Sequence, residues 1–364
     1  MRILLVSGIY FPDVGGPATF VPKLARHLLK NGHSVRVISL QNFKAVRPYE
    51  PWKRTFINRK LPRIIRFPLV ICVIMFYGFN SNIIFANGLH EESVLAGKII
   101  RKRVILKIVG DPIWERAKNR NLTNLDIREF NDIKVPKKLR LEKKLFSWIL
   151  ARAYKVISPS DELLFLMKKI SPKCKTFFIP NGIKIKTIKN VERKFDVIYV
   201  GRLTKWKEVD TLITAVAKIN KSLLIVGDGP EMQEVKKLAS IVGCKATFVG
   251  EKSSKELTNY YLSARVFCLP SSYEGMSHSL LEAMAHETPV VVSNIPANLA
   301  LIQHGVNGLT FELRNYLDLS SQLLKLLNSE TRSKELAIQA KKDIISKYDE
   351  NLILNEYLEL MESN

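Results

Sequence analysis

The chain has 364 residues, 46% of them apolar and 25% charged, which is enough for two domains with a substantial core. Its four cysteines are scattered, with no Cys-x-x-Cys pair and no zinc-like His spacing, which excludes a disulfide scaffold and indicates a reducing compartment without a metal site. The net charge of +23 comes from the first half: residues 1–190 hold 37 Lys and Arg against 12 Asp and Glu, and residues 191–364 hold 20 against 22. This asymmetry predicts an anionic partner for the first half: lipid headgroups, a phosphorylated acceptor or nucleic acid.

A short buried strand is expected at Arg2–Val6, without the longer apolar region and cleavage site of a signal peptide. A loop with Gly15 and Gly16 follows, then a helix that ends near Gly32, and a second strand at Val35–Leu40. This strand-helix-strand opening is typical of a Rossmann-like domain, although Gly-x-Gly-x-x-Gly is absent. Gly15 and Gly16 therefore fit a structural turn as well as a phosphate contact.

A basic segment, Lys44–Arg66, carries eight Lys and Arg against one acid and runs directly into thirteen apolar residues at Phe67–Phe79. That apolar run is too short to span a bilayer, so we expect a buried or interfacial helix. The basic segment is either a solvated face or a membrane-surface patch. In the second case its cations would attract anionic lipid while neighbouring apolar groups insert shallowly.

Two polar side chains follow the next two expected strands, Asn82–Ala86 and Val104–Val109. His90 comes after the first strand and Asp111 after the second, at the carboxyl ends where parallel sheets place their sites. A lone His or Asp at such a position is structural more often than functional. Only their position after the carboxyl ends of two strands makes His90 and Asp111 candidates for a functional site.

The first half ends in a basic helix, Asn131–Leu150, and in a further helix capped by Ser160 or Asp161. Lys184–Lys194 is polar and charged and is the expected linker. Phe195–Val200 then starts a second α/β unit in the way that the first strand started the first.

Arg202 and Lys207 follow this strand at a strand-to-helix turn. An Arg and a Lys five residues apart can converge on one diphosphate, the Arg as a bidentate fork and the Lys as a point charge. The alternative is a pair of exposed basic residues in a loop. A Gly-x-Gly turn with Gly229 follows the next strand and is weak evidence for a nucleotide, and Glu251 follows the strand after that.

The segment Ser271–Met284 lies between two apolar runs and has the pattern strand, loop, helix, strand. The helix is expected to begin near Ser277, which places Glu274 in the preceding loop and Glu282 inside the helix. Backbone N–H groups of Gly275, Met276 and Ser277 would then point out of the sheet edge. Two carboxylates beside such donors suit a ligand with hydroxyls and an anion, such as a sugar nucleotide.

This segment resembles the signature of retaining glycosyltransferases of family 4 (glycosyl transferases group 1), which have the GT-B fold. Arg202-x4-Lys207, the Gly-x-Gly-Pro-Glu turn and Gly15-Gly16 match the same pattern in the same order, over nearly the whole chain and most strongly over 195–310. The resemblance implies an α/β GT-B fold: two Rossmann-like domains facing across a cleft, with a C-terminal helix crossing back to the N-terminal domain. The expected domains are 1–183 for the acceptor, 184–347 for the nucleotide sugar and 348–364 for the crossover helix.

The resemblance also implies residue roles. Arg202 and Lys207 would neutralise the leaving nucleoside diphosphate, and Glu274 with the amides of Gly275, Met276 and Ser277 would hold the donor sugar. The remaining implied contacts are with the ribose (Glu282), the donor phosphates or nucleotide (Gly15, Gly16, Gly229), the base (Glu251) and the acceptor side (His90, Asp111).

The chain departs from the family pattern at two places. Gly110, beside Asp111, occupies a position where the family has a His, which removes one acceptor-side contact. His286 and Glu287 stand where a small residue and a glycine are more common, so we expect a slightly altered turn without loss of activity.

Together these features predict a retaining, metal-independent hexosyltransferase that needs no cofactor besides its nucleotide-sugar donor. The basic first half favours a lipid-linked glycan or glycolipid acceptor and a cytoplasmic, peripheral location at the inner face of the cell membrane. Two alternatives remain open. One is a GT-B sugar-nucleotide 2-epimerase, which the Glu-x7-Glu pattern disfavours. The other is a basic membrane- or nucleic-acid-binding protein that has lost activity; the charge permits it, but no nucleic-acid motif accompanies the charge, so nucleic acid is not the expected partner.

Overall fold

The computed structural model describes residues 1–11, 13, 15–42, 49–120, 122–123, 125, 127–132, 137–185 and 191–363. Parts of four segments discussed above lie outside the described residues: Pro12 and Val14 of the first loop, 43–48 of the basic segment, 133–136 of the basic helix and 186–190 of the linker. The chain divides into two compact units, Met1–Pro180 with Leu354–Asn364, and Asn181–Ile353. The sequence places the boundaries after residues 183 and 347, and the acceptor and donor roles of the two domains stay predictions.

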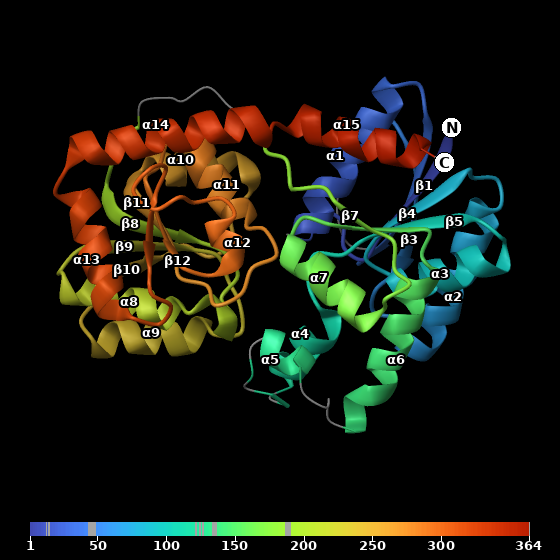
Figure 1. The fold of residues 1–364 in the computed structure, drawn as a ribbon, viewed down its shortest axis with the longest axis horizontal. Helices are drawn as coiled ribbons and strands as arrows, with labels where there is room; N and C mark the ends of the chain where they lie inside the picture. The colour runs from blue at the N-terminus through green and yellow to red at the C-terminus, as the bar shows by residue number, and fades with distance from the viewer. Residues whose placement is uncertain are drawn as a thin grey trace. The chain divides into compact units, whose positions relative to one another are not determined.

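A parallel sheet of seven strands forms the centre of the first unit, in the order β3-β2-β1-β4-β5-β6-β7 (Figure 1). Its inner strands are almost entirely buried, as expected for a sheet with helices on both faces. The strands are β1 (Arg2–Ser7), β2 (Ser34–Gln41), β3 (Lys53–Asn58), β4 (Ile83–Asn87), β5 (Arg103–Lys107), β6 (Lys155–Ser158) and β7 (Thr176–Phe178).

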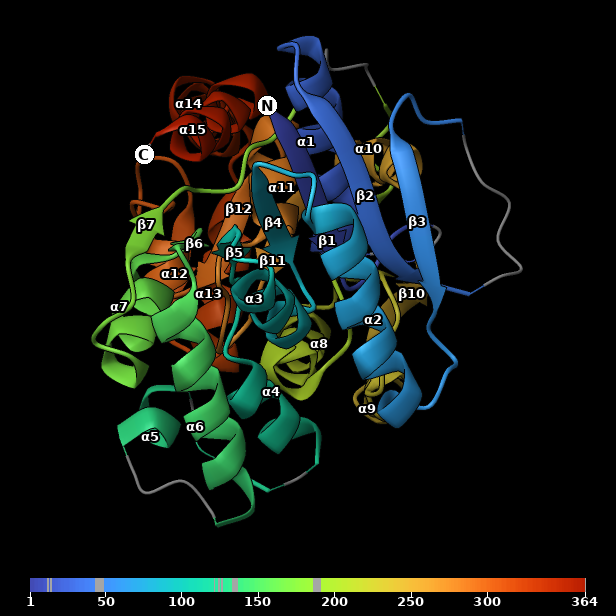
Figure 2. The same ribbon diagram turned by 90° about the vertical axis from the view of Figure 1, so that its right-hand side faces the viewer.

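Helices α2, α3 and α6 lie side by side across one face of this sheet (Figure 2). Helix α1 connects β1 to β2 in the opposite direction along the sheet, so a right-handed crossover places it on the other face. The helices of the unit are α1 (Gly16–Lys30), α2 (Arg63–Gly78), α3 (His90–Ile99), α4 (Pro112–Asn119), α5 (Ile127–Asp132), α6 (Lys137–Arg152) and α7 (Asp161–Ile170). Ser160 caps α7, because its Oγ accepts from the Leu163 N–H. Among the described helices none is both long and apolar enough to cross a membrane.

The edge strand β3 was not expected from the sequence. It lies inside the basic segment and pairs in parallel with β2, from Arg36 opposite Lys53 to Gln41 opposite Asn58. Only Ile57 of its six side chains is buried. An edge strand tolerates polar and charged side chains, because one of its sides faces solvent. Such a strand lacks the apolar pattern by which strands are predicted from sequence.

Six parallel strands form the sheet of the second unit, in the order β10-β9-β8-β11-β12-β13. Its core is one continuous apolar cluster that includes β8, β9, β11 and β12. The strands are β8 (Phe195–Val200), β9 (Ser222–Val226), β10 (Lys245–Phe248), β11 (Ala264–Leu269), β12 (Val290–Ser293) and β13 (Leu309–Phe311). The helices are the 3-10 turn η1 (Lys205–Lys207), α8 (Val209–Lys218), α9 (Met232–Ile241), α10 (Ser254–Leu262), α11 (His278–Ala285), α12 (Pro296–Leu299), α13 (Tyr316–Leu327) and α14 (Glu330–Lys347).

The last helix, α15 (Glu350–Glu362), begins in the second unit and belongs to the first from Leu354 onward. Its Tyr357 ring lies 4.9 Å from the ring of Phe20 on α1 and 5.9 Å from that of Phe85 on β4. This return of the final helix to the N-terminal unit confirms the expected crossover.

Candidate functional site

The second sheet changes direction between β8 and β11. The chain runs outward from β8 through β9 to β10, then returns to β11 on the other side of β8. Parallel sheets bind ligands at such a point, just beyond the carboxyl ends of the two strands. Arg202 and Lys207 follow β8, and Glu274 follows β11, so the fold brings these three predicted residues to one place.

Lys207 and Glu274 form an ion pair there. The Lys207 Nζ lies 2.5 Å from Oε1 of Glu274, and both side chains are largely buried. The Ser271 hydroxyl donates to the same oxygen at 2.7 Å. Glu274 is therefore held by two donors, and Lys207 is fixed at the end of β8 rather than extended into solvent.

Arg202 is exposed, and among the described residues its guanidinium has no hydrogen-bond or ion-pair partner. Its backbone is fixed instead, because the Tyr199 hydroxyl donates to the Arg202 carbonyl at 3.1 Å. Tyr199 is fully buried, and burial with the nearby Glu274 charge raises the pKa of its phenol well above the usual value. A buried, neutral Tyr199 thus anchors the residue that presents the exposed cation.

The loop after Glu274 leads into the N-terminus of α11, as expected. Ser277 caps the helix, its hydroxyl accepting from the Leu280 N–H at 3.3 Å. The backbone of Met276 is held by the first residue of the second unit, because the side-chain amide of Asn181 donates to the Met276 carbonyl oxygen at 3.1 Å. In the described part of the chain no acceptor is found for the backbone N–H groups of Gly275, Met276 and Ser277, which are the donors predicted to face the ligand.

Glu282 is oriented by a buried tyrosine. The Tyr261 hydroxyl donates to Oε2 of Glu282 at 3.0 Å, and the His286 ring stacks on Tyr261 with centroids 5.5 Å apart. Glu287, in the turn after α11, has a left-handed φ of 52° and is held by Lys341 at 2.8 Å; whether this turn differs from that of relatives stays a prediction. His286 thus fills the space beside Tyr261 where the family more often has a small side chain.

Gly229 needs to be glycine for a reason within the protein. A Cβ there would lie 2.2 Å from the carbonyl oxygen of Leu203, so the loops after β8 and β9 cross without room for a side chain. A nucleotide contact at Gly229 stays a prediction. Glu251 is exposed just after β10, two strands away from β8, and its place near the base also stays a prediction.

The first sheet has its own change of direction, between β1 and β4. Gly15 and Gly16 follow β1 and begin α1, and His90 follows β4 and begins α3. Gly15 has a φ of 153°, in the region that favours glycine, and a Cβ there would lie 2.7 Å from the Ile9 side chain. A Cβ on Gly16 would meet nothing within 4 Å, so the protein itself does not require glycine at that position.

His90 lies over a buried lysine. Its Nε2 is 3.0 Å from the carbonyl oxygen of Lys107 and 3.1 Å from the Gly88 nitrogen, and desolvation lowers the pKa of His90 to about 4. The Lys107 ammonium lies 3.6 Å from the centre of the Phe20 ring, and burial lowers its pKa to about 7. His90 is therefore a neutral imidazole at pH 7, able to exchange hydrogen bonds but not to supply a positive charge.

The contacts of Asp111 are structural. Its Oδ1 accepts from the N–H groups of Ile113 and Trp114, which caps α4, and its Oδ2 accepts from the Asn131 amide at 2.9 Å. The carboxylate is buried with both oxygens in use. Both carboxylate oxygens are thus engaged within the protein, and a catalytic role for Asp111 on the acceptor side stays a prediction.

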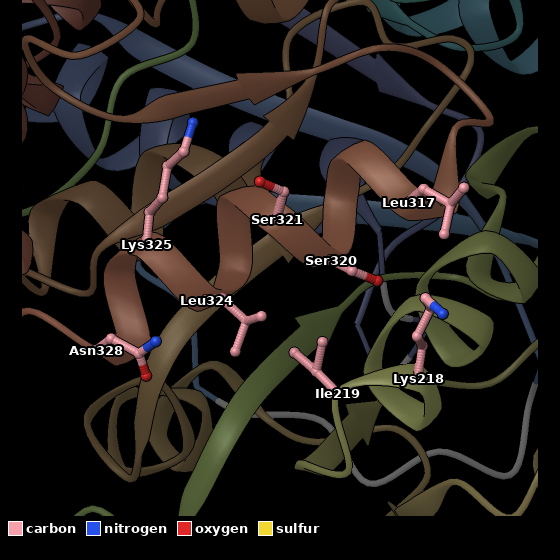
Figure 3. A pocket seen from close by; sticks show the side chains of 8 residues that line it. All are labelled: Lys218, Ile219, Leu317, Ser320, Ser321, Leu324, Lys325 and Asn328. Atoms are coloured by element: carbon pink, nitrogen blue, oxygen red, sulfur yellow. The ribbon is translucent and has the colours of Figure 1, made fainter.

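One hollow of the second unit, of about 630 Å³, lies between the C-terminal end of α8 and the length of α13 and is lined by Lys218, Ile219 and residues of α13 from Leu317 onward (Figure 3). None of the predicted site residues lines it, so this groove does not belong to the site. A smaller one of about 350 Å³ adjoins Leu203 and Lys205, and its three acids, Asp210, Glu231 and Glu234, make it unsuitable for a diphosphate. No group of His, Cys, Asp or Glu able to hold a metal ion occurs in the described ranges.

Comparison with known sequences relates the second unit to a family. The model of the family "Glycosyl transferases group 1" matches residues 183–343, a range that contains the switch point, Arg202, Lys207, Glu274 and Glu282. The match covers less than half of the chain. This agrees with the family that the sequence motifs resemble.

Similar proteins match either the second half of the chain or most of it. An uncharacterised glycosyltransferase of Methanocaldococcus jannaschii is 34% identical over 166 residues, which cover 44% of this chain and only 43% of that protein. A GDP-mannose-dependent alpha-mannosyltransferase of Corynebacterium glutamicum is 24% identical over 93% of this chain and 84% of its own length. An alpha-monoglucosyldiacylglycerol synthase of Streptococcus pneumoniae is also 24% identical, over 92% of this chain and 82% of that protein.

Solved structures match the whole chain. A sucrose-phosphate synthase from Thermosynechococcus elongatus has a TM-score of 0.80 at 21% identity and covers 99% of this chain and 98% of its own. Anabaena HepE in complex with UDP and glucose has a TM-score of 0.80 at 19% identity, covering both chains fully. The predicted fold class, α/β GT-B with two Rossmann-like domains, is confirmed.

Several residues of the site were not predicted from the sequence. Tyr199, Tyr261 and Lys107 look like core residues in the sequence, and only the packing of the folded chain shows which groups each of them meets. Ser271 and Asn181 were also not predicted as site residues. Their signal was position: Ser271 stands at the start of the segment Ser271–Met284, and Asn181 lies just before the linker.

Proposed function

We propose that the chain is a retaining, metal-independent glycosyltransferase that moves a hexose-type sugar from a nucleoside-diphosphate sugar to a lipid-linked glycan or a glycolipid. The observation that carries this proposal is the meeting of Arg202, Lys207 and Glu274 at the switch point of the second sheet. Two cations and a row of amide donors at the N-terminus of α11 suit a diphosphate and a sugar.

In the proposed mechanism the cations stabilise the leaving group. Negative charge grows on the nucleoside diphosphate as the bond to the sugar breaks, and Arg202 with Lys207 would offset that charge in the transition state. Glu274 would then exchange part of its contact with Lys207 for a sugar hydroxyl, and Glu282 would receive the ribose. The acceptor would attack from the face that the diphosphate leaves, so the anomeric configuration is kept.

The acceptor class follows from charge and from relatives. The first half carries the whole excess of positive charge, and one full-length relative is an alpha-monoglucosyldiacylglycerol synthase, a name that denotes a glycolipid product. A cytoplasmic location at the inner membrane face, in surface polysaccharide or glycolipid synthesis, belongs to the same proposal.

The test is donor-dependent thermal shift and donor hydrolysis with UDP-, GDP- and ADP-sugars, in EDTA, on the wild type and on Glu282→Ala. We expect one donor to raise the melting temperature of the wild type only, and NMR of the product to show the anomer of the donor. A folded wild type that no nucleotide sugar stabilises would contradict the proposal. Conversion of the donor to its 2-epimer would replace it with the epimerase alternative.

A further inference from the structure

Helix α2 is apolar on both of its faces. Val70, Ile74 and Gly78, spaced four residues apart, are buried against the rest of the first unit. The opposite side of the same helix carries Ile65, Leu69, Cys72, Phe76 and Phe79, which recur at the helical repeat; we call these five residues the outer stripe of α2. A surface helix normally has polar residues on this side, and an all-round apolar helix is normally covered.

The outer stripe is open to solvent over its whole length. The exposed fractions are 54% for Ile65, 38% for Leu69, 73% for Phe76 and 66% for Phe79, and Cys72 is exposed between them. Ile64, on the flank of the stripe, is 84% exposed. Figure 2 shows α2 beside α3 across one face of the sheet, so the stripe lies on a surface helix of the unit.

Positive charge surrounds the stripe. Residues 51–90 contain six Lys and Arg and no Asp or Glu, and α2 itself contains no acid. Lys60 and Arg63 are exposed at the start of the helix. Arg101 is also exposed. It lies near the C-terminal end of α2, because its neighbour Ile100 packs against Gly78.

The nearest acids offset only part of this charge. Glu91, at the start of α3, pairs with Arg63 at 3.2 Å and lies 4.0 Å from Arg116, which leaves Lys60 and Arg101. Its neighbour Glu92 faces Arg63 and Arg66, and burial raises the pKa of its carboxyl. The stripe is apolar and the cations lie near its ends. It therefore matches a partner that has an apolar interior beneath an anionic surface.

We propose that the outer stripe of α2 docks on an anionic lipid bilayer, with α2 lying in the plane of the headgroups. An exposed apolar helix face with cations near both ends fits a fluid bilayer, into which Phe and Ile side chains can insert shallowly while Lys and Arg meet lipid phosphates. A folded protein partner would need a matching groove. This inference deepens the proposed function and rests on its lipid-linked acceptor, because docking would bring such an acceptor to the enzyme.

Besides Arg63, three further basic residues expected in a membrane patch have internal contacts. Arg54 pairs with Glu50, Arg59 with Asp13, and the Arg66 guanidinium donates to the Arg59 carbonyl. The basic segment Lys44–Arg66 is therefore partly structural. The surface that the structure assigns to lipid is the outer stripe with its border, not the charge run as a whole.

The test is co-sedimentation of the full chain with vesicles of phosphatidylcholine alone or with about a third phosphatidylglycerol. The wild type should pellet with the anionic vesicles and be released as salt rises from ~0.1 M to ~0.5 M, because screening weakens the attraction. The double variant Phe76→Ser with Phe79→Ser should lower the bound fraction at least about five-fold. Ile241→Ser is the matched control, since Ile241 is 72% exposed on α9 of the second unit.

Depth is measured with an environment-sensitive dye on Cys72, in a Cys244→Ser background that removes the other cysteine that is not fully buried. Dye emission should shift to the blue only with anionic vesicles and be quenched by lipids spin-labelled near the headgroup. Equal pelleting of the wild type and the stripe variant would overturn the proposal. A dye shift without vesicles, together with dimers that the stripe variant abolishes, would overturn it in favour of a second copy of the chain.

The same samples separate this inference from the proposed function. Donor-dependent thermal shift needs no lipid and depends on the second unit, so the stripe variant should keep it. If the wild type does not bind vesicles but keeps its donor-dependent thermal shift, the membrane-docking proposal is wrong and the transferase proposal still stands.

Discussion

The Nζ of Lys207 lies 2.5 Å from Oε1 of Glu274, although the two residues are 67 positions apart and follow different strands. The pair closes the switch point between β8 and β11, with Arg202 exposed beside it. One cation of the proposed diphosphate site is therefore built into the fold, and the other is free of described side-chain contacts. This difference makes the two cations separable by mutation.

Arg202→Met is expected to change activity without changing stability. Its side chain is exposed and holds no described partner, so the melting temperature should stay within about 1 °C. Loss of one cation from the leaving group should lower kcat/KM about 100-fold. The measurement is donor turnover together with thermal melting of the purified variant.

Lys207→Met is expected to lower both activity and stability. It leaves the buried Glu274 carboxylate without its cation, which costs about 3 kcal/mol of the free energy of unfolding. Adding Glu274→Gln to the variant should restore much of that stability and none of the activity. If Arg202→Met were as destabilising as Lys207→Met, the assignment of one free and one structural cation would be wrong.

Two glycines of the candidate site should respond in opposite ways to alanine. Gly229→Ala places a Cβ 2.2 Å from the Leu203 carbonyl oxygen and should cost about 2–3 kcal/mol of stability. Gly16→Ala places its Cβ in open space at the start of α1 and should leave stability within about 1 kcal/mol of the wild type. If donor phosphates approach Gly16, this variant should still raise the donor KM; an unchanged KM in the folded variant would remove Gly16 from the donor site.

Much of this site could be predicted from local pattern. The apolar runs of β8 and β11 stand out, polar residues follow each, and parallel strands bring such ends together. What the pattern does not contain is which of those residues pair. Lys207 and Glu274 were each assigned to a ligand, and only the adjacency of β8 and β11 shows that they also bind each other.

The features missed elsewhere have the same physical origin. β3 is an edge strand whose exposed basic side chains mask its period of two. Lys107 is the last residue of the apolar strand β5. The sequence there is the same whether the lysine amine is exposed at the end of the strand or buried. In α2, an apolar run of thirteen residues predicts a helix, but whether its second face is covered depends on segments far away in the chain.

Lys107 should make stability depend on pH. Burial lowers its pKa to about 7, against about 10.4 in the unfolded chain, so the unfolded state binds more protons between these values. The contribution of Lys107 to stability is therefore full above about pH 10.4 and is lost as pH falls toward 7, by up to about 1.4 kcal/mol per pH unit. Denaturant unfolding of wild type and Lys107→Met at several pH values from 7 to 10 should show the wild type gaining on the variant as pH rises. A difference that stays constant across this range would contradict the buried titration.

Lys155→Met should loosen the end of the final helix. The buried Lys155 ammonium donates to the carbonyls of Leu360 and Ser363 at 2.9 Å and to the Ser363 hydroxyl at 2.7 Å, and its charge sits at the C-terminal end of the α15 dipole. Removing these bonds leaves carbonyls without a donor and should cost about 2 kcal/mol locally. Hydrogen exchange should accelerate in peptides covering Leu354–Ser363 and stay unchanged in those covering β8 and β11. Lys155→Arg, which keeps the charge and the donors, is the control and should protect the helix better than Met does; equal exchange in the two variants would show that the ammonium does not hold α15.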